Sequence, residues 1–399
     1  MPRVAVVASH PVQYQAPWFR ALAKLVDLEV FFCHRQDAQG QRGAGFGDAF
    51  EWDVPLLEGY RFQWLNNVSP APGVDAFAGC DTPEISDRLH EGRFDACLVH
   101  GWYLKSYMQA IRACWRQHVR LLVRGDSHLK TPRSRLKSAV KYLPYRWFLN
   151  RIDAHLYVGE ANRTYLRAYR VPDSKLFFAP HFVDNGFFRR GADVARQAGE
   201  RFRMREELGV APDATVFLYV GKFIEVKRPM DVVRATARAP RGSIHTAFVG
   251  SGPLEEAMRH EATHSGAPVS FMGFRNQTQL PACYAAADAL VVPGSETWGL
   301  VANEAMACGL PVIASDSVGS ADDLITAAST GFVYREGDIN ALTATMMALR
   351  RLLIQSAPVV AQAVAERIDR YTSASAASGL LAALSSPTMS RAQAFAEVS

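Results

Sequence analysis

Two glutamates stand eight positions apart in a segment that otherwise has the composition of a protein core. They are Glu296 and Glu304 in "GSETWGLVANEAMACGLPVIAS", residues 294–315. A carboxylate among apolar residues is unfavourable unless a polar partner meets it. Gly294 ends a predicted buried strand, and a helical pattern begins at Gly299. Glu296 is therefore expected in a loop at the carboxyl end of a strand, and Glu304 about one turn into the following helix.

The start of that helix is suited to binding an anion, because its free backbone N–H groups and the positive end of its dipole favour a phosphate. One interpretation is that the helix start holds a diphosphate while the two carboxylates accept hydrogen bonds from sugar hydroxyls. The other is that both acids only complement the helix dipole. The dipole explains Glu296 more easily than Glu304, which stands among Ala, Met and Cys.

A pair of lysines could act on the same diphosphate. "YVGKFIEVKRP" places Lys222 just after a predicted strand and Lys227 at the start of the next helix. Two cations there could stabilise a departing diphosphate as its charge develops. Two solvated lysines are the alternative.

The segment "SETWGLVANEAMACGLPVIAS", with seven residues between its glutamates, resembles the signature of the family 4 retaining glycosyltransferases. The resemblance extends over most of the chain and is strongest from "ATVFLYVGKFIEVKRP" to "TGFVYREGDINAL". It implies an α/β protein with the GT-B fold, in which two Rossmann-like doubly wound domains face each other across a cleft. It also implies a UDP-, GDP- or ADP-sugar as donor substrate, with no further cofactor.

The resemblance implies a role for each residue that matches the motif. Glu296 contacts the donor sugar, and Glu304 binds the ribose. Along the diphosphate lie the backbone groups of Thr297, Trp298, Gly299, Leu300 and Val301. The family usually has Arg and then Lys where this chain has Lys222 and Lys227, so Lys222 supplies a point charge instead of a bidentate fork.

Two further residues are assigned by the same resemblance. In "FDACLVHGWYLKSY", His100 ends a strand where the family has a histidine that reaches the donor sugar. We predict His100 and Glu296 as the catalytic residues, with a structural histidine as the alternative. Phe274, in "VSFMGFRNQ", is expected near the nucleobase or else packed against the following helix.

The first predicted strand-to-helix turn, "ASHPVQYQAPWF", lacks the glycines that family members often carry there. It is therefore no dinucleotide fingerprint, which argues against an NAD-dependent enzyme. We predict that His10, Gln13 and Tyr14 contact the acceptor instead. Arg124 and Asp126, in "VRGDSH", follow another predicted strand and face the same cleft, unless they form an internal ion pair.

Short β-branched runs alternate with helix-length amphipathic segments, which predicts parallel sheets covered by helices. The runs are "RVAVVAS", "LEVFFC", "DACLVH", "VRLLVRG", "AHLYVGE", "ATVFLYVG", "IHTAFVG", "VSFMG", "DALVVPG" and "LPVIAS". The pattern turns polar near "RRGADVARQAGERFRMREE", where we place a domain boundary. We predict an N-terminal acceptor-side domain (1–186), a nucleotide-sugar-binding domain (187–368), a C-terminal helix that crosses back to the first domain (369–385) and a tail (386–399).

The composition is typical of a globular protein. Of 399 residues, 49% are hydrophobic and 21% charged, and no run approaches the roughly 20 apolar residues that cross a bilayer. Six scattered cysteines are typical of reduced thiols in a cytosolic protein. The lack of an Asp-x-Asp motif agrees with metal-independent transfer, so we expect no metal site. The net charge of +5 suits phosphate ligands, but no nucleic-acid-binding module is recognisable.

Residues 128–151 contain seven Lys/Arg and no acidic residue, interleaved with Leu, Tyr, Trp and Phe. Such a segment could rest peripherally on the inner face of an anionic membrane and hold the enzyme near a lipid-linked acceptor. A solvated basic helix is the alternative. The glycine-rich stretch 40–50 is expected to be a mobile loop that could close over an acceptor.

We therefore predict a cytoplasmic glycosyltransferase that moves a sugar from a nucleotide diphosphate to an acceptor with retention of configuration. The resemblance implies a glycan or lipid-linked acceptor, as in bacterial surface-polysaccharide synthesis. Two alternatives stay open. A nucleotide-sugar epimerase of the same fold would convert the donor without an acceptor. A non-catalytic assembly subunit would bind the nucleotide sugar without turnover.

Overall fold

The computed structural model describes residues 1–35, 51–130 and 135–387, with the side chains of 135–138 left out. The chain divides into two compact units. Among the described residues, unit 1 comprises 1–35, 55–130, 135–181 and 373–387, and unit 2 comprises 51–54 and 182–372. The whole of the predicted loop 40–50 and most of the predicted tail 386–399 lie outside the described residues.

Unit 1 is built on a seven-stranded parallel sheet in the order β3-β2-β1-β4-β5-β6-β7. Its strands are β1 (Arg3–Ala8), β2 (Asp27–Phe32), β3 (Arg61–Trp64), β4 (Ala96–Val99), β5 (Arg120–Gly125), β6 (Ala154–Tyr157) and β7 (Leu176–Phe178). Its α-helices are α1 (Ala16–Leu22), α3 (Ile85–Gly92), α4 (Lys105–Gln117), α5 (Arg135–Asn150), α6 (Glu160–Ala168) and α15 (Ser373–Ser385). The strand order reverses its direction between β1 and β4, which is where doubly wound sheets bind ligands.

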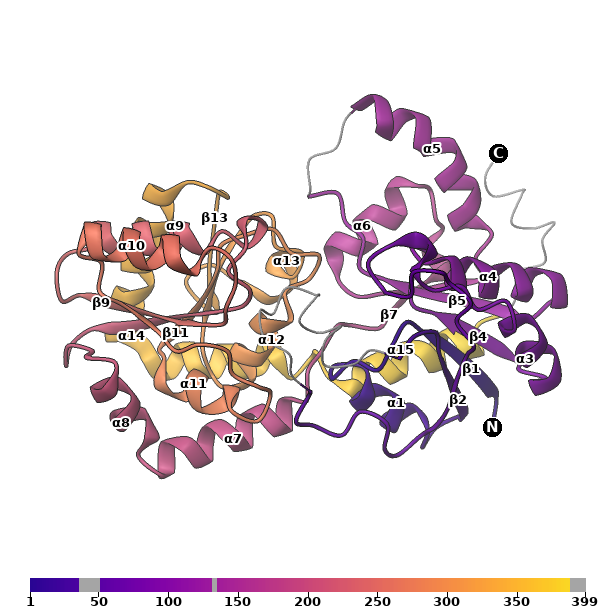
Figure 1. The fold of residues 1–399 in the computed structure, drawn as a ribbon, viewed down its shortest axis with the longest axis horizontal. Coiled ribbons are helices and arrows are strands. Elements are labelled where there is room, and N and C mark those ends of the chain that lie inside the picture. The colour runs from indigo at the N-terminus through magenta and orange to yellow at the C-terminus, as the bar shows by residue number, and fades with distance from the viewer. Residues whose placement is uncertain (36–50, 131–134, 388–399) are drawn as a thin grey trace. The chain divides into compact units, whose positions relative to one another are not determined.

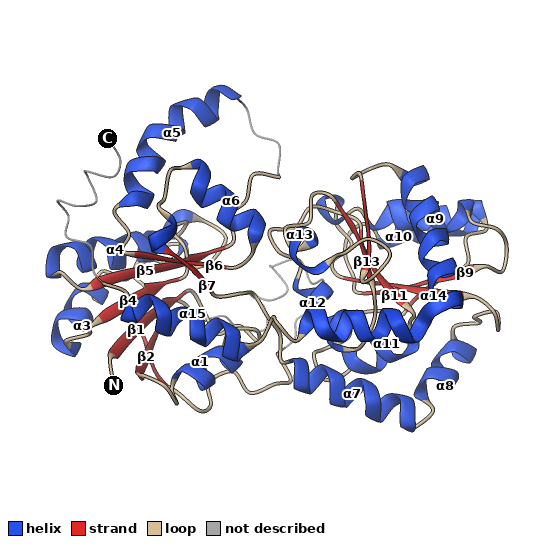
Figure 2. Ribbon diagram, turned by 180° about the vertical axis from the view of Figure 1, so that it is seen from behind, coloured by secondary structure: helices blue, strands red, loops and turns tan. Residues whose placement is uncertain are grey.

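Unit 2 repeats this plan with six parallel strands in the order β10-β9-β8-β11-β12-β13. They are β8 (Thr215–Val220), β9 (Ile244–Val249), β10 (Val269–Phe271), β11 (Ala289–Val292), β12 (Val312–Ser315) and β13 (Gly331–Tyr334). The α-helices are α7 (Asn185–Gln197), α8 (Glu200–Glu207), α9 (Pro229–Arg238), α10 (Glu255–Ser265), α11 (Leu280–Ala286), α12 (Leu300–Ala307), α13 (Ala321–Leu324) and α14 (Ile339–Ile368). Helices surround each sheet (Figures 1 and 2).

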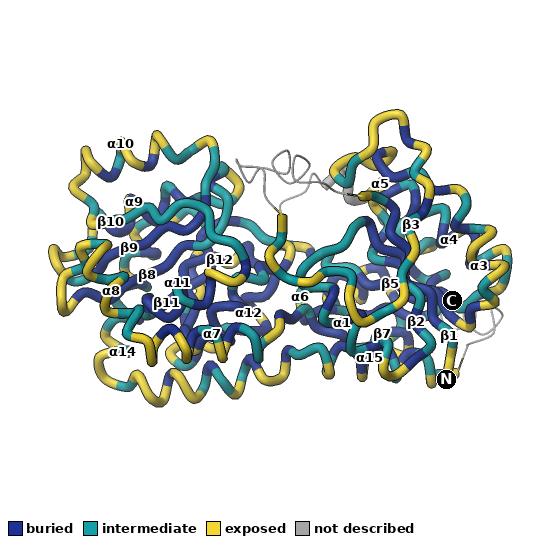
Figure 3. The backbone as a smooth tube through the Cα atoms, turned by 60° about the horizontal axis from the view of Figure 1, so that its bottom comes forward, coloured by how far each residue is buried: buried dark blue, intermediate teal, exposed yellow. Residues whose placement is uncertain are grey.

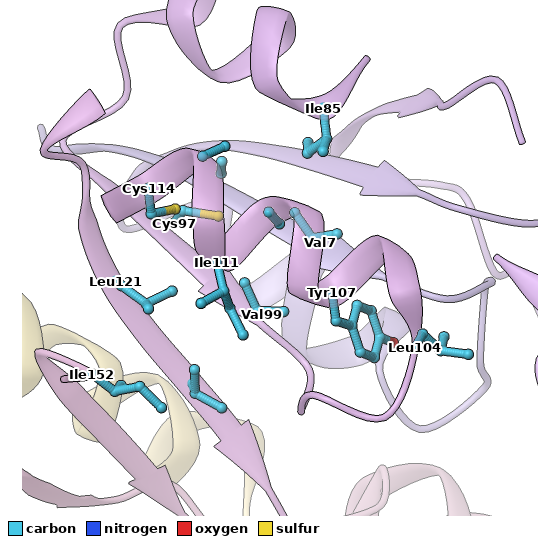
Figure 4. Close-up of a cluster of buried hydrophobic side chains, with 14 of the residues drawn as sticks. Val7, Ile85, Cys97, Val99, Leu104, Tyr107, Ile111, Cys114, Leu121 and Ile152 are labelled. Carbon is cyan, nitrogen blue, oxygen red and sulfur yellow. The ribbon is translucent and has the colours of Figure 1, made fainter. Parts of the chain in front are cut away.

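The sequences of the strands are continuous apolar runs because helices cover both faces of each sheet. Every residue of β4 is buried, and Ile111 and Cys114 of α4 pack on Cys97 and Val99 of that strand (Figure 4). Figure 3 shows the same pattern for both units, with buried strands inside and exposed residues on the outer helices. All six cysteines are buried and free, and all lie in the described residues.

All ten strands predicted from the sequence are present, but β3, β7 and β13 were not predicted. Strand β3 alternates exposed and half-buried residues, and β7 has only three residues. Strand β13 starts at Gly331, where a Cβ would overlap the carbonyl oxygen of Val312. Glycine is rare in strands, so this requirement for a close backbone approach hides the strand from a propensity argument.

The chain passes from unit 1 to unit 2 at 181–182 and returns at 372–373, whereas the sequence analysis placed these joints at 186 and 369. Helix α15 packs on α1, β6 and β7, and a Cβ on Gly379 would overlap the Phe178 carbonyl oxygen. The Arg120 guanidinium donates to the Leu384 carbonyl at 3.0 Å. Residues 51–54, expected in the first domain, group with unit 2, where the Asn276 amide donates to the Glu51 carbonyl at 2.7 Å.

Within the described part of the chain, no helix combines the length and the hydropathy needed to cross a bilayer.

Candidate functional site

Two predicted donor-binding residues and one predicted catalytic residue of unit 2 follow strands at one edge of its sheet. Lys222 follows β8, Phe274 follows β10 and Glu296 follows β11. The strands of this sheet are parallel, so their carboxyl ends share one edge. The side chains of Lys222 and Phe274 are half-buried there.

The loop after β11 is pressed against the turn that contains Lys227. A Cβ on Gly294 would overlap the carbonyl oxygen of Val226 and the Cα of Lys227, so glycine is required. The Ser295 N–H donates to the same Val226 carbonyl at 3.1 Å. This approach brings Lys227 Nζ into an ion pair with Glu296 Oε1. The first of the two glutamates thus meets one of the two predicted lysines.

Helix α12 begins directly after Gly299, whose φ of +91° lies in the left-handed region that favours glycine. Its cap residue, Gly299, offers no side-chain acceptor, and the Ala302 N–H donates to the Gly299 carbonyl at 2.9 Å, so the N–H groups of Leu300 and Val301 are the ones that lie before the α-helical bonding pattern. The loop before the helix is held on its other side, where the Gly319 N–H donates to the Glu296 carbonyl at 3.0 Å. The Ser320 N–H likewise donates to the Trp298 carbonyl at 3.1 Å.

The Trp298 side chain belongs to the interior of unit 2. Trp298 is 4% exposed, its Nε1 donates to Asn303 Oδ1 at 2.8 Å, and its ring lies 6.1 Å from that of Tyr371. The backbone of Trp298 is therefore the part of this residue that is suited to contact a ligand.

Glu304 is completely buried inside α12. The Tyr284 hydroxyl donates to its Oε2 at 2.6 Å, and Gln277 Nε2 lies 3.5 Å from its Oε1. Both glutamates therefore have side-chain partners in the structure, whereas the sequence analysis expected them to meet sugar hydroxyls instead of other side chains. The sequence analysis did not single out Tyr284 or Gln277 as site residues. A tyrosine in the alanine-rich α11 segment has the pattern of an ordinary core residue.

Unit 1 contains a pocket of about 280 Å³ at the carboxyl ends of β1, β4 and β5. Its lining comes from the end of β5, from the loops that follow the three strands, from Tyr107 of α4 and from one residue after β7: Ser9, His10, Val12, Gln15, His100, Gly101, Trp102, Tyr103, Tyr107, Arg124, Gly125, Asp126, Ser127 and His181. This is the edge where β1 and β4 mark the reversal of strand order. The pocket brings together four residues that were predicted from three separate motifs: His10, His100, and the pair Arg124 and Asp126.

Gln13 and Tyr14 are not among the described residues that line this pocket, whereas Gln15 is. The N–H groups of Gln15 and Ala16 both donate to the Val12 carbonyl, which makes a tight turn before α1. That turn places positions 12 and 15 on the pocket side. Gln15 Nε2 lies 3.0 Å from His100 Nδ1, so the amide holds the imidazole ring in place.

His181 links Arg124 to Asp126. Arg124 Nη2 lies 3.2 Å from His181 Nδ1, and His181 Nε2 lies 3.8 Å from Asp126 Oδ2. The guanidinium also donates to the Pro180 carbonyl at 2.8 Å and stacks 4.7 Å above the Trp18 ring. Burial lowers the pKa of Arg124 to about 10, and Asp126 opposes this shift, so Arg124 stays cationic at neutral pH.

The pocket imidazoles are neutral at neutral pH. Burial, followed by the charges of Arg124 and His181, lowers the pKa of His100 to about 3. Burial also lowers the pKa of His10 to about 4, with His34 acting in the same direction and Asp75 against it. These rings are therefore suited to hydrogen bonding with a neutral ligand more than to pairing with an anion.

The chain matches the family model for glycosyl transferases group 1 over residues 200–352. It is 32% identical over 362 residues to D-inositol 3-phosphate glycosyltransferase of Actinosynnema mirum, a match that covers 79% of this chain and 81% of that protein. It is also 31% identical over 183 residues to sulfoquinovosyl transferase SQD2 of Arabidopsis thaliana, covering 44% of this chain and 34% of that protein.

Solved structures give the same fold. Anabaena Alr3699/HepE in complex with UDP-glucose has a TM-score of 0.70 at 16% identity, covering 97% of this chain and 100% of that one. Sucrose-phosphate synthase from Thermosynechococcus elongatus has a TM-score of 0.69 at 18% identity, covering 100% of this chain and 99% of that one. Together with the two parallel sheets, these likenesses confirm the predicted GT-B fold.

Proposed function

We propose, from the premise that this chain belongs to the group 1 glycosyl transferases, that it moves a sugar from a nucleotide diphosphate to a glycan or lipid-linked acceptor with retention of configuration. The observation that carries this proposal is the arrangement of Glu296, Lys227 and buried Glu304 around the start of α12. We further infer that transfer needs no metal ion and takes place in the cytoplasm, in the synthesis of a bacterial surface glycan.

Negative charge develops on the nucleoside diphosphate as it leaves the sugar. The first N–H groups of α12 and the ammonium groups of Lys222 and Lys227 are the donors that would stabilise that charge. Lys227 is already held by its ion pair with Glu296, so little reorganisation is needed when the donor binds. An ammonium has three N–H donors, so Lys227 can keep Glu296 while it contacts a phosphate oxygen.

Glu304 would hold the ribose, with Phe274 beside the base. A carboxylate offers about four acceptor positions on its two oxygens, and Tyr284 and Gln277 occupy one on each oxygen. A ribose hydroxyl can donate to the same carboxylate. Burial strengthens such hydrogen bonds because water does not compete for the carboxylate.

The pocket of unit 1 would take the acceptor, through His10, Arg124 and Asp126, and His100 would donate to or accept from a sugar hydroxyl. The lowered pKa of His100 supports a hydrogen-bonding role over a role as a general base. We propose that the departing phosphate accepts the proton of the acceptor hydroxyl on the same face of the sugar, which gives retention.

The first donor to test is UDP-glucose, because a solved structure of the same fold contains it. The experiment incubates the chain with UDP-, GDP- and ADP-sugars and a panel of glycan and lipid-linked acceptors, with and without EDTA. Proton NMR of the product reads the anomeric configuration. We expect transfer with retention from one donor, unaffected by EDTA and lost in Lys227→Met. The matched control is Lys24→Met, an exposed lysine of unit 1.

The two alternatives give different results in the same assay. Conversion of the donor to its epimer without an acceptor would replace the proposal with a nucleotide-sugar epimerase. Nucleotide binding without turnover across all acceptors would favour an assembly subunit. Inversion at the anomeric carbon, or no stabilisation by any nucleotide, would contradict the proposal outright.

A further inference from the structure

Positive charge is concentrated in one continuous part of unit 1. Residues 96–152 contain twelve Lys/Arg and a single acidic residue, Asp126, which lines the pocket. The whole chain has 44 Lys/Arg and 39 Asp/Glu, so the remainder of the chain is net acidic. The basic segment comprises β4, α4, β5 and α5. A surface of this sign attracts an anionic partner.

Helix α5 in this segment has two different faces. Its inner face packs through aromatic rings: Tyr142 stacks 5.6 Å from Tyr169, and Phe148 lies 5.9 Å from Trp102 and 6.1 Å from Trp115. These contacts fix the helix on unit 1 and determine which side faces outward. Figures 1 and 2 show α5 at the margin of unit 1, beyond the helices that cover the sheet.

The outer face of α5 exposes an apolar stripe, of which the Trp147 ring also packs edge-on against the Trp115 ring of α4 at 6.3 Å. Val140 is 69% exposed, Leu143 68% and Trp147 55%, at the spacing i, i+3, i+7 that puts them on one side of a helix. Exposed Lys141 stands next to Val140. Single exposed apolar residues are common, but three in one stripe within a basic segment mark an interaction surface.

Cations flank this stripe. The Arg151 guanidinium lies 4.8 Å from the Trp147 ring and 5.1 Å from the Trp115 ring. Helix α4, which carries Trp115, also exposes Arg112 and Arg116 one turn apart. An apolar stripe with a tryptophan and surrounding cations is the composition of a helix that lies in the interface of an anionic bilayer.

We propose that the outer face of α5 (Val140, Lys141, Leu143 and Trp147), with Arg112 and Arg116 of α4, docks on an anionic lipid bilayer. The stripe inserts at the level of the headgroups, and the cations pair with lipid phosphates. Nucleic acid offers the same phosphates but no apolar phase for Val140 and Leu143, so the stripe favours lipid. The role of this contact rests on the proposed function: docking on the bilayer would keep the pocket of unit 1 close to a lipid-linked acceptor.

The test is sedimentation of the full chain with vesicles, which needs no donor, acceptor or turnover and is therefore independent of the proposed function. The vesicles are phosphatidylcholine alone or phosphatidylcholine mixed with phosphatidylglycerol. We expect binding to the anionic vesicles at about 0.1 M salt and strong weakening at about 1 M, where the screening length falls from about 10 Å to about 3 Å. Equal binding to both kinds of vesicle would overturn the electrostatic part.

Variants test the charged part and the apolar part of this surface separately. Lys141→Glu should weaken partitioning onto anionic vesicles about 25-fold, because each positive charge near such a surface contributes roughly fivefold and reversal removes it twice. Leu143→Ser with Trp147→Ser should weaken partitioning about tenfold or more.

Controls for these variants come from elsewhere in the chain. Phe202→Ser on α8 removes an apolar side chain that is 76% exposed, and Lys24→Glu reverses an exposed lysine. We expect both to bind vesicles like the wild type, and thermal melting checks that every variant is folded. Wild-type binding by the α5 variants, or binding of duplex DNA but not of vesicles, would refute the lipid surface.

Discussion

Removing one hydroxyl group from α11 tests how the buried glutamate is held. The Tyr284 hydroxyl donates to Glu304 Oε2 at 2.6 Å, and both residues are completely buried. The other carboxylate oxygen, Oε1, lies 3.5 Å from Gln277 Nε2. Tyr284→Phe keeps the ring that fills the core and removes only the donor. The variant therefore isolates the hydrogen bond from the packing.

The expected cost follows from the charge of the acceptor. A hydrogen bond to a charged group contributes about 1.5–3 kcal/mol, and a buried carboxylate that loses its donor cannot recover it from water. We expect Tyr284→Phe to lower the stability of unit 2 by about 2–3 kcal/mol. For a domain of this size, 1 kcal/mol corresponds to about 2–4 °C, so the melting temperature should fall by about 4–12 °C.

The assay is thermal melting of Tyr284→Phe, Glu304→Gln and the double variant. Glu304→Gln removes the charge and keeps the shape, so in that background Tyr284→Phe should cost about 1 kcal/mol, the contribution of a neutral hydrogen bond. UDP is added to identify the transition of the nucleotide-binding unit, which a bound ligand raises. Equal costs of Tyr284→Phe in both backgrounds would refute the claim that Glu304 is held as a carboxylate by this hydroxyl.

Three further predictions concern single side chains. Lys227→Met should lower kcat about 10²–10³-fold with a smaller change in donor KM, because the charge it stabilises develops in the transition state, and Lys227→Arg should recover part of the loss in the same steady-state assay. Gln15→Leu removes the 3.0 Å contact to His100 and should lower kcat/KM about three- to tenfold, with an unchanged melting curve as the check on folding. The pKa of His100 is lowered from 6.5 to about 3 by burial and by Arg124 and His181, so between these values the unfolded chain binds the extra proton and stability falls as the pH falls. Melting of wild type from about pH 6.5 to about pH 4 should therefore show a steeper loss than melting of His100→Gln, and parallel curves would contradict this assignment.

The sequence predicted the features that depend on local signals. The apolar runs predict the strands because a strand buried on both faces needs no partner information to be recognised. Gly299, directly before α12, and Gly309, shortly after it, predict the helix that carries Glu304. By contrast, the ion pair of Glu296 with Lys227 joins loops 69 residues apart. The only local sequence signal of this ion pair is Gly294. A glycine there indicates that another backbone segment comes close, but it does not identify that segment.

The choice between neighbouring residues in the first turn was also beyond the sequence. Gln13, Tyr14 and Gln15 are all polar or amphipathic, and one residue of difference in turn geometry decides which side chain faces the pocket. The two hydrogen bonds to the Val12 carbonyl set that geometry and select Gln15. Propensity alone does not predict which of these three side chains faces the pocket, because residues in a turn follow no periodic pattern.

The two glutamates solve the same problem of burial in different ways, and the difference bears on how a donor could bind. Glu296 meets a cation in a pair whose side chains are 19% and 26% exposed, so a phosphate can approach Lys227 without breaking the core. Glu304 is fully buried, and Tyr284 and Gln277 are among the side chains that contact it. Tyr284 is anchored in α11 and makes the short bond, whereas Gln277 makes the long one, and its Oε1 is buried with no partner among the described residues. An amide in that position is already poorly satisfied, so its displacement by a ribose hydroxyl costs little. Gln277 is therefore the side chain through which the nucleotide would gain access to Glu304.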